Sequence, residues 1–231
     1  MGFFSTWLQK LHETFIETQY WKLMLEGFGN TIVITLGALL IGVLIGTLIA
    51  VIKYCAEGTK ALKPLAWICD LYVTVIRGVP VVVLLLIFYF IIMTSAEGIT
   101  VGILTFGINS GAYMAELIRG GINSVDRGQM EAGRSLGLNY SITMRFVVVP
   151  QAIKNILPAL GNEFITLLKD TSLITVIGGK EMLYAAQAIY AKTYAPMMPL
   201  VGTAILYLIV VVLFTWLLGI LERRLRQSDR R

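Results

Sequence analysis

Long stretches without a charged residue constrain this chain more than any other feature. Four runs contain no Asp, Glu, Lys or Arg: residues 27–52, 78–96, 98–115 and 193–221. A helix rises about 1.5 Å per residue, so about 20 apolar residues cross the hydrocarbon core of a bilayer. Backbone polar groups must be satisfied within such a segment, which favours helices. The runs therefore predict four membrane-spanning helices.

The composition agrees with a membrane protein and excludes several other classes. Hydrophobic residues make up 57% of the chain and charged residues 14%, against about 25% charged residues in a soluble domain. Disordered segments are poor in apolar residues, so disorder is excluded as well. Two cysteines rule out a disulfide scaffold, and a single histidine, His12, argues against a multi-histidine metal site. We expect no catalytic residue, metal or cofactor in the chain itself.

A fifth span is expected in a more polar stretch, residues 151–178. Its charged residues are separated by apolar segments, so we interpret it as a helix that faces protein rather than lipid. The second span is expected to start before Gly78 and to bend near Pro80. The five predicted spans are about 28–54, 66–95, 99–120, 151–178 and 195–221.

The first 26 residues differ from the spans, because they contain three glutamates and no apolar core of a signal peptide. Apolar side chains recur there at helical spacing, which predicts an amphipathic helix lying in the membrane interface. These apolar residues are Phe3, Phe4, Trp7, Leu8, Leu11 and Phe15. At the other end, residues 227–231 form a basic tail.

The distribution of Lys and Arg predicts the orientation of the chain. With five spans, 14 of the 19 cationic residues fall on one side, four on the other, and Lys169 lies within a span. Cytoplasmic loops carry the excess of Lys and Arg, so we expect the N-terminus outside and the C-terminus inside. This rule also explains the net charge of +5, and no nucleic acid partner is needed to account for it.

The loop of about residues 122–150 is expected to hold two short helices. Asp126 can cap the first helix, Gly137 can end it in the left-handed conformation, and Asn139 or Ser141 can cap the second. Pro150 then suits the first turn of the next span. Two exposed helices would form a knob that either docks another protein or packs on its own bundle.

Several motifs in fixed order resemble a known family. Glu131-Ala132-Gly133, followed by Gly137 and then Val149-Pro150, is similar to the EAA loop of ABC importer permeases, with Gly in place of the second Ala. The similarity extends to the polar amino acid subfamily over residues 27–226. Its stretches are GFGNTIVIT (27–35), VIRGVP (75–80), SGAYMAELIRGGI (110–122), GQMEAGRSLG (128–137), PQAIKNILPALGNEFI (150–165), KDTSLITVIG (169–178) and ERRLR (222–226).

The resemblance implies an all-α, five-span subunit with the type I ABC importer fold, in a bacterial or archaeal cytoplasmic membrane. Its implied partners are a second permease subunit, identical or not, two cytoplasmic ATPase subunits, an extracytoplasmic amino-acid-binding protein and membrane lipid. ATP and Mg²⁺ would bind the ATPase subunits, since this chain has no GxxxxGK[ST] phosphate-binding loop. Which amino acid is carried stays open.

The implied contact with the ATPase subunits lies in the loop of residues 128–150. The expected coupling residues are Glu131, Ala132, Gly133, Arg134, Gly137 and Arg145. Glu131 would pair with a cation of the ATPase, and the two glycines would allow close backbone approach. Alternatively, Glu131 forms a local ion pair or cap, and the two arginines are solvated cytoplasmic charges.

Ionisable and polar residues within the spans are candidates for the substrate pathway, because charges there are costly. The candidates are Arg77, Tyr113, Glu116, Glu163, Lys169, Asp170 and Ser172. Glu116 alternatively pairs with Arg119, and Glu163 with Arg77 or a neighbouring subunit. Lys169 and Asp170 alternatively form an external gate or a lock between helices. Gly42 and Gly46 indicate close helix packing.

Two other classes of function fit the sequence less well than the importer permease. A membrane enzyme would need a catalytic constellation, which a chain with one histidine supports poorly. A passive channel or scaffold would need neither ATP nor a partner, and the structured loop with Gly137 argues against it.

Overall fold

The structure is a computed structural model that describes His12, residues 15–16 and residues 18–228. The predicted amphipathic helix of residues 1–26 lies largely outside the described residues, as does most of the 227–231 tail. The described elements are α2 (Tyr20–Gly58), η2 (Lys60–Leu62), α3 (Lys63–Gly78), α4 (Val81–Ile87), η3 (Phe88–Ile92), α5 (Gly98–Asn123), α6 (Arg127–Ser135), α7 (Tyr140–Thr143), η4 (Met144–Val148), α8 (Val149–Asp170), η5 (Thr171–Ile177), α9 (Met182–Thr193) and α10 (Met197–Ser228).

The chain forms two compact units, and the long helices α2, α5, α8 and α10 contribute residues to both. Unit 1 comprises residues 1–38, 81–106 and 165–215, and unit 2 comprises residues 39–80, 107–164 and 216–231. No strand occurs among the residues that the structure describes. The expected all-α architecture is confirmed for this part of the chain.

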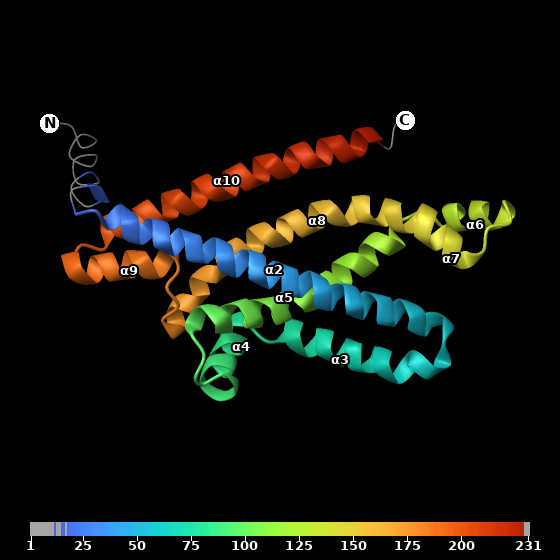
Figure 1. Cartoon of the computed structure of the whole chain (residues 1–231), viewed down its shortest axis with the longest axis horizontal. Helices are drawn as coiled ribbons and strands as arrows, with labels where there is room; N and C mark the ends of the chain where they lie inside the picture. Colours follow the sequence, from blue (N-terminus) through green and yellow to red (C-terminus); the bar gives the residue numbers. More distant parts are fainter. Residues whose placement is uncertain (1–11, 13–14, 17, 229–231) are drawn as a thin grey trace. The chain divides into compact units, whose positions relative to one another are not determined.

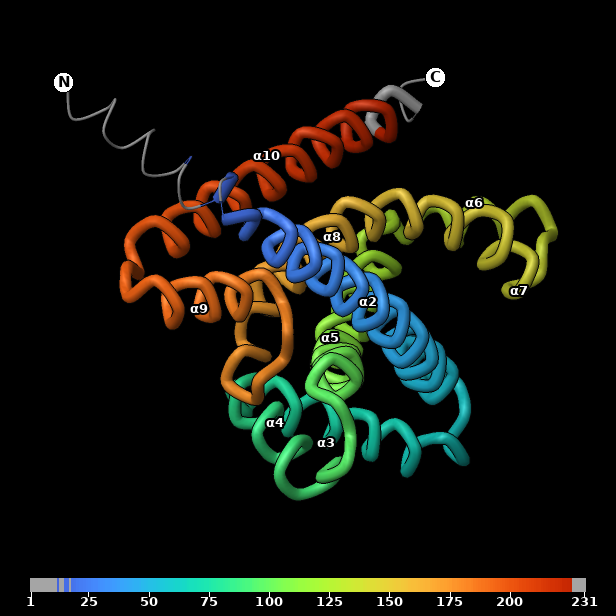
Figure 2. Tube along the Cα trace, turned by 60° about the vertical axis from the view of Figure 1, so that its left-hand side comes forward, coloured from blue at the N-terminus to red at the C-terminus, as the bar shows by residue number. Residues whose placement is uncertain are grey.

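The core of unit 1 joins the start of α2 to α9. Met24 packs with Met182, Ala185, Ala186 and Ile189 in a buried apolar cluster. Gly27 makes this approach possible, since a Cβ atom there would lie 2.8 Å from the backbone oxygen of Glu181. Figure 1 and Figure 2 both show α9 beside the start of α2.

The core of unit 2 joins the later part of α2 to α3 and α5. Ile49, Cys69, Val73, Ala112 and Ala115 form its buried cluster, and Figure 1 shows α3 running beside α2. Close packing at small residues was predicted for this part of α2. It is confirmed, because added Cβ atoms at Gly42 and Gly46 would lie 2.8 Å from Ser110 Oγ and 2.3 Å from Met114 Cβ.

The second expected span, residues 66–95, is not one continuous helix. Helix α3 ends at Gly78, Val79 is extended, and α4 begins at Val81. The interruption was predicted at this place. Its physical reason is Pro80, which disfavours helical backbone at the preceding residue.

The expected span of residues 151–178, the fourth in chain order, is not a single α-helix either. The α-helix α8 ends at Asp170, and Thr171–Ile177 continue as the 3₁₀-helix η5. Gly178 then ends this helix in the left-handed conformation, with φ of 74°. The following helix α9 was not predicted, because residues 182–193 were assigned to a loop outside the membrane.

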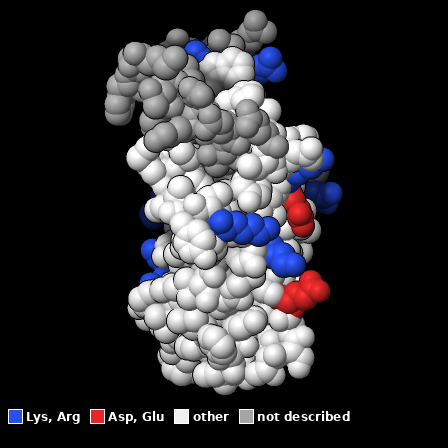
Figure 3. Space-filling view, turned by 90° about the vertical axis from the view of Figure 1, so that its left-hand side faces the viewer, with Lys and Arg blue, Asp and Glu red and all other residues white. Residues whose placement is uncertain are grey.

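Three of the described helices are long and apolar enough to cross a membrane, and a fourth span follows if α3, α4 and η3 count as one. The three are Tyr20–Gly58, Gly98–Asn123 and Met197–Leu225. Helix α8 does not reach the same hydropathy, since it carries four charged residues. On the face drawn in Figure 3, charged side chains are sparse among neutral ones, which fits the apolar composition.

Candidate functional site

The predicted knob is present as helices α6 and α7 of unit 2 (Figure 1). The Asp126 side chain caps α6 by accepting a hydrogen bond from the backbone N–H of Gly128 at 2.6 Å. Gly137, with φ of 78°, ends α6. The Leu138 and Gly137 N–H groups donate to the carbonyls of Gly133 and Arg134, which is the Schellman pattern. The predicted start and end of this helix are confirmed.

Helices α6 and α7 of the knob lie close together because glycine occupies position 133. Asn139 caps α7 by accepting a hydrogen bond from Ile142 N–H at 2.9 Å, so Asn139 rather than Ser141 is the cap. Gly133 is buried, and a Cβ atom there would lie 2.4 Å from Thr143 Cγ2. Gly133 thus allows α6 to approach α7 of the same chain, whereas its predicted close approach to the ATPase stays a prediction. At Gly137 nothing lies within 4 Å of a Cβ position, so glycine is needed there for the left-handed backbone conformation and not for close packing.

The outer surface of the knob is exposed and mixes charged with apolar side chains. Glu131, Ala132, Arg134 and Arg145 are all exposed. Leu136 and Phe146 are 80% and 67% exposed, and sequence reasoning did not assign them to the site. Leu136 precedes Gly137 and Phe146 follows Arg145, so their position next to predicted coupling residues could have identified them. Apolar side chains exposed next to charges are typical of a protein interaction surface.

The candidate Glu116 lies in an ion-pair cluster of unit 2. Its Oε1 is 3.4 Å from Lys53 Nζ, and its Oε2 is 3.5 Å from Nη2 of Arg119. Lys53 also pairs with Asp70 Oδ1 at 2.6 Å. The alternative in which Glu116 pairs with Arg119 is confirmed, and Lys53 and Asp70 are members that sequence reasoning missed. Lys53, Asp70 and Glu116 lie near the ends of successive predicted spans and differ in charge, which could have predicted their pairing.

Two further candidate groups lie in unit 2. The guanidinium of Arg77 is 5.1 Å from the centroid of the Tyr113 ring, which is within the range of a cation–π interaction. Glu163 Oε1 accepts a hydrogen bond from the hydroxyl of Ser110 at 2.8 Å. Ser110 is buried and Glu163 is half-buried, so this bond joins α5 to α8.

The remaining candidates belong to unit 1, at the junction of α8 and η5. Lys169 is exposed and Asp170 is half-buried. The Ser172 hydroxyl donates to the carbonyl of Lys169 at 2.8 Å, so Ser172 stabilises the turn where the α-helix tightens. The structure therefore divides the seven candidates between two units.

A buried carboxylate that sequence reasoning missed is Glu181, which is fully buried. It caps α9 by accepting the backbone N–H groups of Leu183 and Tyr184 at 2.8 and 2.7 Å. It also accepts the hydroxyls of Thr175 and Tyr207 at 2.6 and 2.9 Å. Because four donors occupy its oxygens, Glu181 holds η5, α9 and α10 together rather than offering a site to a ligand. Gly178-Gly179 is a helix-end signal and Glu is not a preferred N-cap residue, so no local signal identified Glu181.

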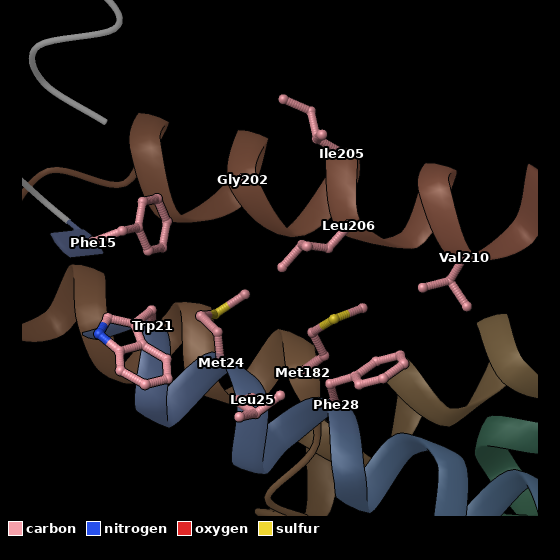
Figure 4. Close-up of a pocket in the computed structure, with 10 residues that line it drawn as sticks. All are labelled: Phe15, Trp21, Met24, Leu25, Phe28, Met182, Gly202, Ile205, Leu206 and Val210. Carbon is pink, nitrogen blue, oxygen red and sulfur yellow. The ribbon is translucent and has the colours of Figure 1, made fainter. Parts of the chain in front are cut away.

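Two cavities differ in the chemistry they offer. In unit 1, a cavity of about 450 Å³ lies between α2 and α10, where Met24, Leu206 and Met182 point toward one another (Figure 4). The ten residues lining it are all apolar or glycine, so it does not suit a charged amino acid. In unit 2, a cavity of about 620 Å³ is lined by Glu116, Lys154, Asn155 and Glu222 among others, and thus presents both signs of charge.

Among the described residues, no three His, Cys, Asp or Glu side chains are grouped so that they could hold a metal ion. In unit 2, Asn155 Nδ2 donates to Ser124 Oγ at 2.8 Å across the edge of the polar cavity. The charged and polar groups of this part of the chain can therefore bind a zwitterion by ion pairs and hydrogen bonds.

Comparison with known proteins gives one family and several relatives. The family model described as the inner membrane component of binding-protein-dependent transport systems matches residues 38–227. An arginine transport system permease protein, ArtQ of Bacillus subtilis (strain 168), is 35% identical over 210 residues, covering 89% of this chain and 94% of the relative. A putative glutamine transport system permease protein, GlnP of Rickettsia bellii (strain RML369-C), is 35% identical over 206 residues, covering 87% and 92%.

Solved structures extend the comparison to the fold. The crystal structure of an amino acid ABC transporter with histidines contains a chain that is 41% identical, with a TM-score of 0.84 and coverage of 90% of this chain and 96% of that chain. A chain of the methionine ABC transporter MetNI, in an inward-facing conformation, is 21% identical with a TM-score of 0.75, covering 90% and 98%. The latter likeness shows the fold alone.

Proposed function

Because this chain belongs to the family of binding-protein-dependent transport inner membrane components, we propose that it is the permease subunit of an ATP-driven amino acid importer. The observation that carries the proposal is the exposed, capped pair of helices α6 and α7 at the place of the EAA-like motif. The names of its relatives support an amino acid as the substrate. The all-helical fold agrees with that of type I importer membrane subunits.

The proposed topology has five spans, with the N-terminus outside and the C-terminus in the cytoplasm. Its spans are α2, the interrupted pair α3–α4 with η3, α5, α8 with η5, and α10. Helix α8 is included despite its charges, because the half-buried Glu163 is bonded to Ser110 of α5 and does not face lipid. The cationic residues near α6, α7 and the end of α10 support this orientation.

In the proposed mechanism, two permease subunits form the pathway and two ATPase subunits grip one knob each. Glu131, Arg134 and Arg145 are exposed on the knob and would form ion pairs with the ATPase. Ala132 lies on the same exposed surface, while Gly133 and Gly137 give α6 and α7 their mutual geometry. Closure of the ATPase dimer on ATP and Mg²⁺ would then move the knobs together and rock the spans between two states.

Each unit, taken by itself, contains charged residues that are candidates for the proposed substrate pathway. In unit 2, the polar cavity that includes Glu116 offers carboxylates and Lys154 to the two ends of an amino acid. Unit 2 contains three further candidates outside this cavity, namely Arg77, Tyr113 and Glu163. The candidates of unit 1 are Lys169, Asp170 and Ser172. A polar or charged amino acid fits this chemistry, and an extracytoplasmic binding protein would deliver it.

The test is reconstitution of the importer with its partners. The chain is co-expressed with the neighbouring ATPase gene product, and ATP hydrolysis and amino acid uptake are measured in lipid with the cognate binding protein. Copurification in fixed stoichiometry and hydrolysis stimulated by one amino acid would support the proposal and identify the substrate. Solute flux without ATP would favour a passive channel, and chemical conversion of a substrate by the chain alone would favour a membrane enzyme.

A further inference from the structure

A pocket of unit 2 has no role in the proposed transport cycle. It has a volume of about 310 Å³ and lies where α2 ends, α3 begins and α5 ends. We call it the two-sign pocket, because its lining presents cations and carboxylates together. Its polar and aromatic lining residues are Lys53, Glu57, Lys63, Trp67, Asp70 and Arg119.

The two-sign pocket lies at the boundary between hydrocarbon and water. Lys53 directly follows the uncharged run of residues 27–52, and the apolar sequence of α3 resumes at Pro64. Trp67 is 65% exposed at the pocket, and tryptophan is enriched at the membrane interface because its ring is apolar and its N–H is polar. A ligand here can therefore have its polar part in the pocket and its apolar part in the bilayer.

The charges of the pocket suit a ligand that carries both signs. Lys53 is only 15% exposed and is already neutralised by Asp70 at 2.6 Å. Lys63 is an exposed cation and Glu57 an exposed carboxylate. Arg119 and Asp70 are exposed as well, although each already pairs within the protein, with Glu116 and Lys53. An anion would be repelled by the carboxylates and a simple cation by Lys63 and Arg119. A zwitterion can satisfy both sets at once.

The first turn of α3 adds to the attraction for a phosphate. Lys63 is the first residue of this helix of 16 residues. The Lys63 N–H is bonded to the carbonyl of Lys60, and Pro64 has no N–H, so the first turn contributes the positive end of the helix dipole and the Lys63 ammonium. The phosphate group is therefore best placed beside Lys63 and Arg119.

Next to the pocket, α3 presents an apolar surface along its length. Ile68, Leu71 and Val75 are exposed, with Trp67 at the pocket end. Leu48 and Val51 of α2 are exposed as well. Acyl chains that descend from the pocket would find apolar side chains along these helices.

We infer that the two-sign pocket binds the headgroup of a zwitterionic phospholipid that has a primary ammonium. The phosphate meets Lys63 and Arg119, the ammonium meets Glu57 and Asp70, and the acyl chains lie along α3. A primary ammonium has N–H donors for the carboxylates, whereas a quaternary ammonium has none. The position at the interface depends on the sequence and the pocket alone, and only the choice of the cytoplasmic leaflet rests on the proposed topology.

The experiment measures retained lipid on the purified full-length protein by native mass spectrometry. Phosphatidylethanolamine and phosphatidylcholine with identical acyl chains are offered at equal concentration. We expect at least several-fold more bound phosphatidylethanolamine. Lys63→Gln should remove most of this preference, whereas Lys60→Gln should keep it, because Lys60 is an exposed cation of the same loop that does not line the pocket.

A second variant pair tests the ammonium. Glu57→Gln should lower the preference for phosphatidylethanolamine over phosphatidylcholine, and Glu97→Gln, at an exposed carboxylate of unit 1, should leave it unchanged. Equal retention of the two lipids, or equal losses in Lys63→Gln and Lys60→Gln, would overturn the inference. So would cross-linking of Trp67→Cys between two copies, because the surface would then be a subunit interface. Lipid retention needs neither ATP nor uptake, so its failure is distinct from failure of the proposed function.

Discussion

Replacing Gly133 by alanine is predicted to disturb the geometry of the knob. The added Cβ atom would lie 2.4 Å from Cγ2 and 2.6 Å from Oγ1 of Thr143. Both distances are far below van der Waals contact, and neither atom is the end of a long flexible side chain. Helix α6 must therefore move away from α7, and the exposed residues of the knob shift with it.

The magnitude follows from two opposing contributions. Overpacking of a well-packed contact costs about 1–3 kcal/mol. Alanine in place of glycine favours the helix by about 1 kcal/mol. The net destabilisation of the native knob is thus between about 0 and 2 kcal/mol. Since about 1.4 kcal/mol is a factor of ten in an equilibrium constant, up to about 30-fold fewer knobs would have the docking geometry.

The assay compares Gly133→Ala, Thr143→Ala and the double variant in the reconstituted importer. Binding of the ATPase subunit is titrated, and uptake is measured at subsaturating ATPase. Thr143→Ala alone removes the hydrogen bond from Thr143 Oγ1 to Asn139 O at 3.1 Å, a loss of about 1 kcal/mol. It also removes the two atoms nearest the new Cβ, so the double variant should bind the ATPase better than Gly133→Ala.

The reasoning would be refuted by additive effects of the two substitutions. It would also be refuted if Gly133→Ala bound the ATPase and transported as well as the unaltered protein while Thr143→Ala was impaired. Either result would mean that the contact between Gly133 and Thr143 does not set the geometry of the knob.

Three further substitutions test other parts of the structure. Glu131→Arg should abolish uptake and weaken copurification of the ATPase, because it reverses the exposed charge at the centre of the knob; pull-down and uptake assays measure this. Glu181→Gln should destabilise the protein by about 1–3 kcal/mol, seen as a lower Tm. In the native protein both carboxylate oxygens of Glu181 accept hydrogen bonds, and in the variant the amide NH₂ group, which cannot accept one, replaces one of these oxygens. Lys53→Met should lower Tm more than Asp70→Asn, because it leaves two carboxylates, Asp70 and Glu116, without their shared cation.

Glu131→Arg and Glu181→Gln each have a separate control, and Asp70→Asn is the comparison for Lys53→Met. Arg127→Gln changes an exposed charge at the start of α6 and should keep most of the uptake. Lys180→Gln, beside Glu181 but exposed, should leave Tm unchanged. If Glu131→Arg assembled and transported normally, the docking role of Glu131 would be wrong. A Tm of Glu181→Gln equal to that of Lys180→Gln would mean that Glu181 does not hold α9 and α10 together.

The parts of the fold that follow local rules could be predicted from the sequence. Uncharged runs locate α2, α5 and α10, and Pro80 locates the break between α3 and α4. Within the knob, Asp126 and Asn139 belong to the small set of preferred N-cap residues, and Gly137 suits the left-handed turn, although the choice of Asn139 over Ser141 needed the structure. Such signals depend on a few neighbouring residues, so one sequence is enough to read them.

The parts that depend on contacts distant in sequence could not be predicted. Glu181 bonds to Tyr207, which is 26 residues away, and Lys53 bonds to Glu116, which is 63 residues away. Helix α9 was missed although Met182, Ala185, Ala186 and Ile189 recur at helical spacing, because the segment between two predicted spans was interpreted only as a loop. Glu116 and its neighbour Arg119 could be paired from the sequence, but Lys53 and Asp70 required the packing of α2 and α3 against α5.

Helix α10 presents a different kind of surface from α5. Only 6% of its most apolar window is buried, against 56% for α5. Few of its side chains pack against the rest of the chain. Lipid tails are about as apolar as leucine, so exchanges among leucine, isoleucine, valine and phenylalanine change little wherever α10 faces lipid. In a saturation mutagenesis library, α10 should accept exchanges among these residues almost freely while α5 rejects them. Genetic variation in this protein would then accumulate on α10 and leave little trace on transport.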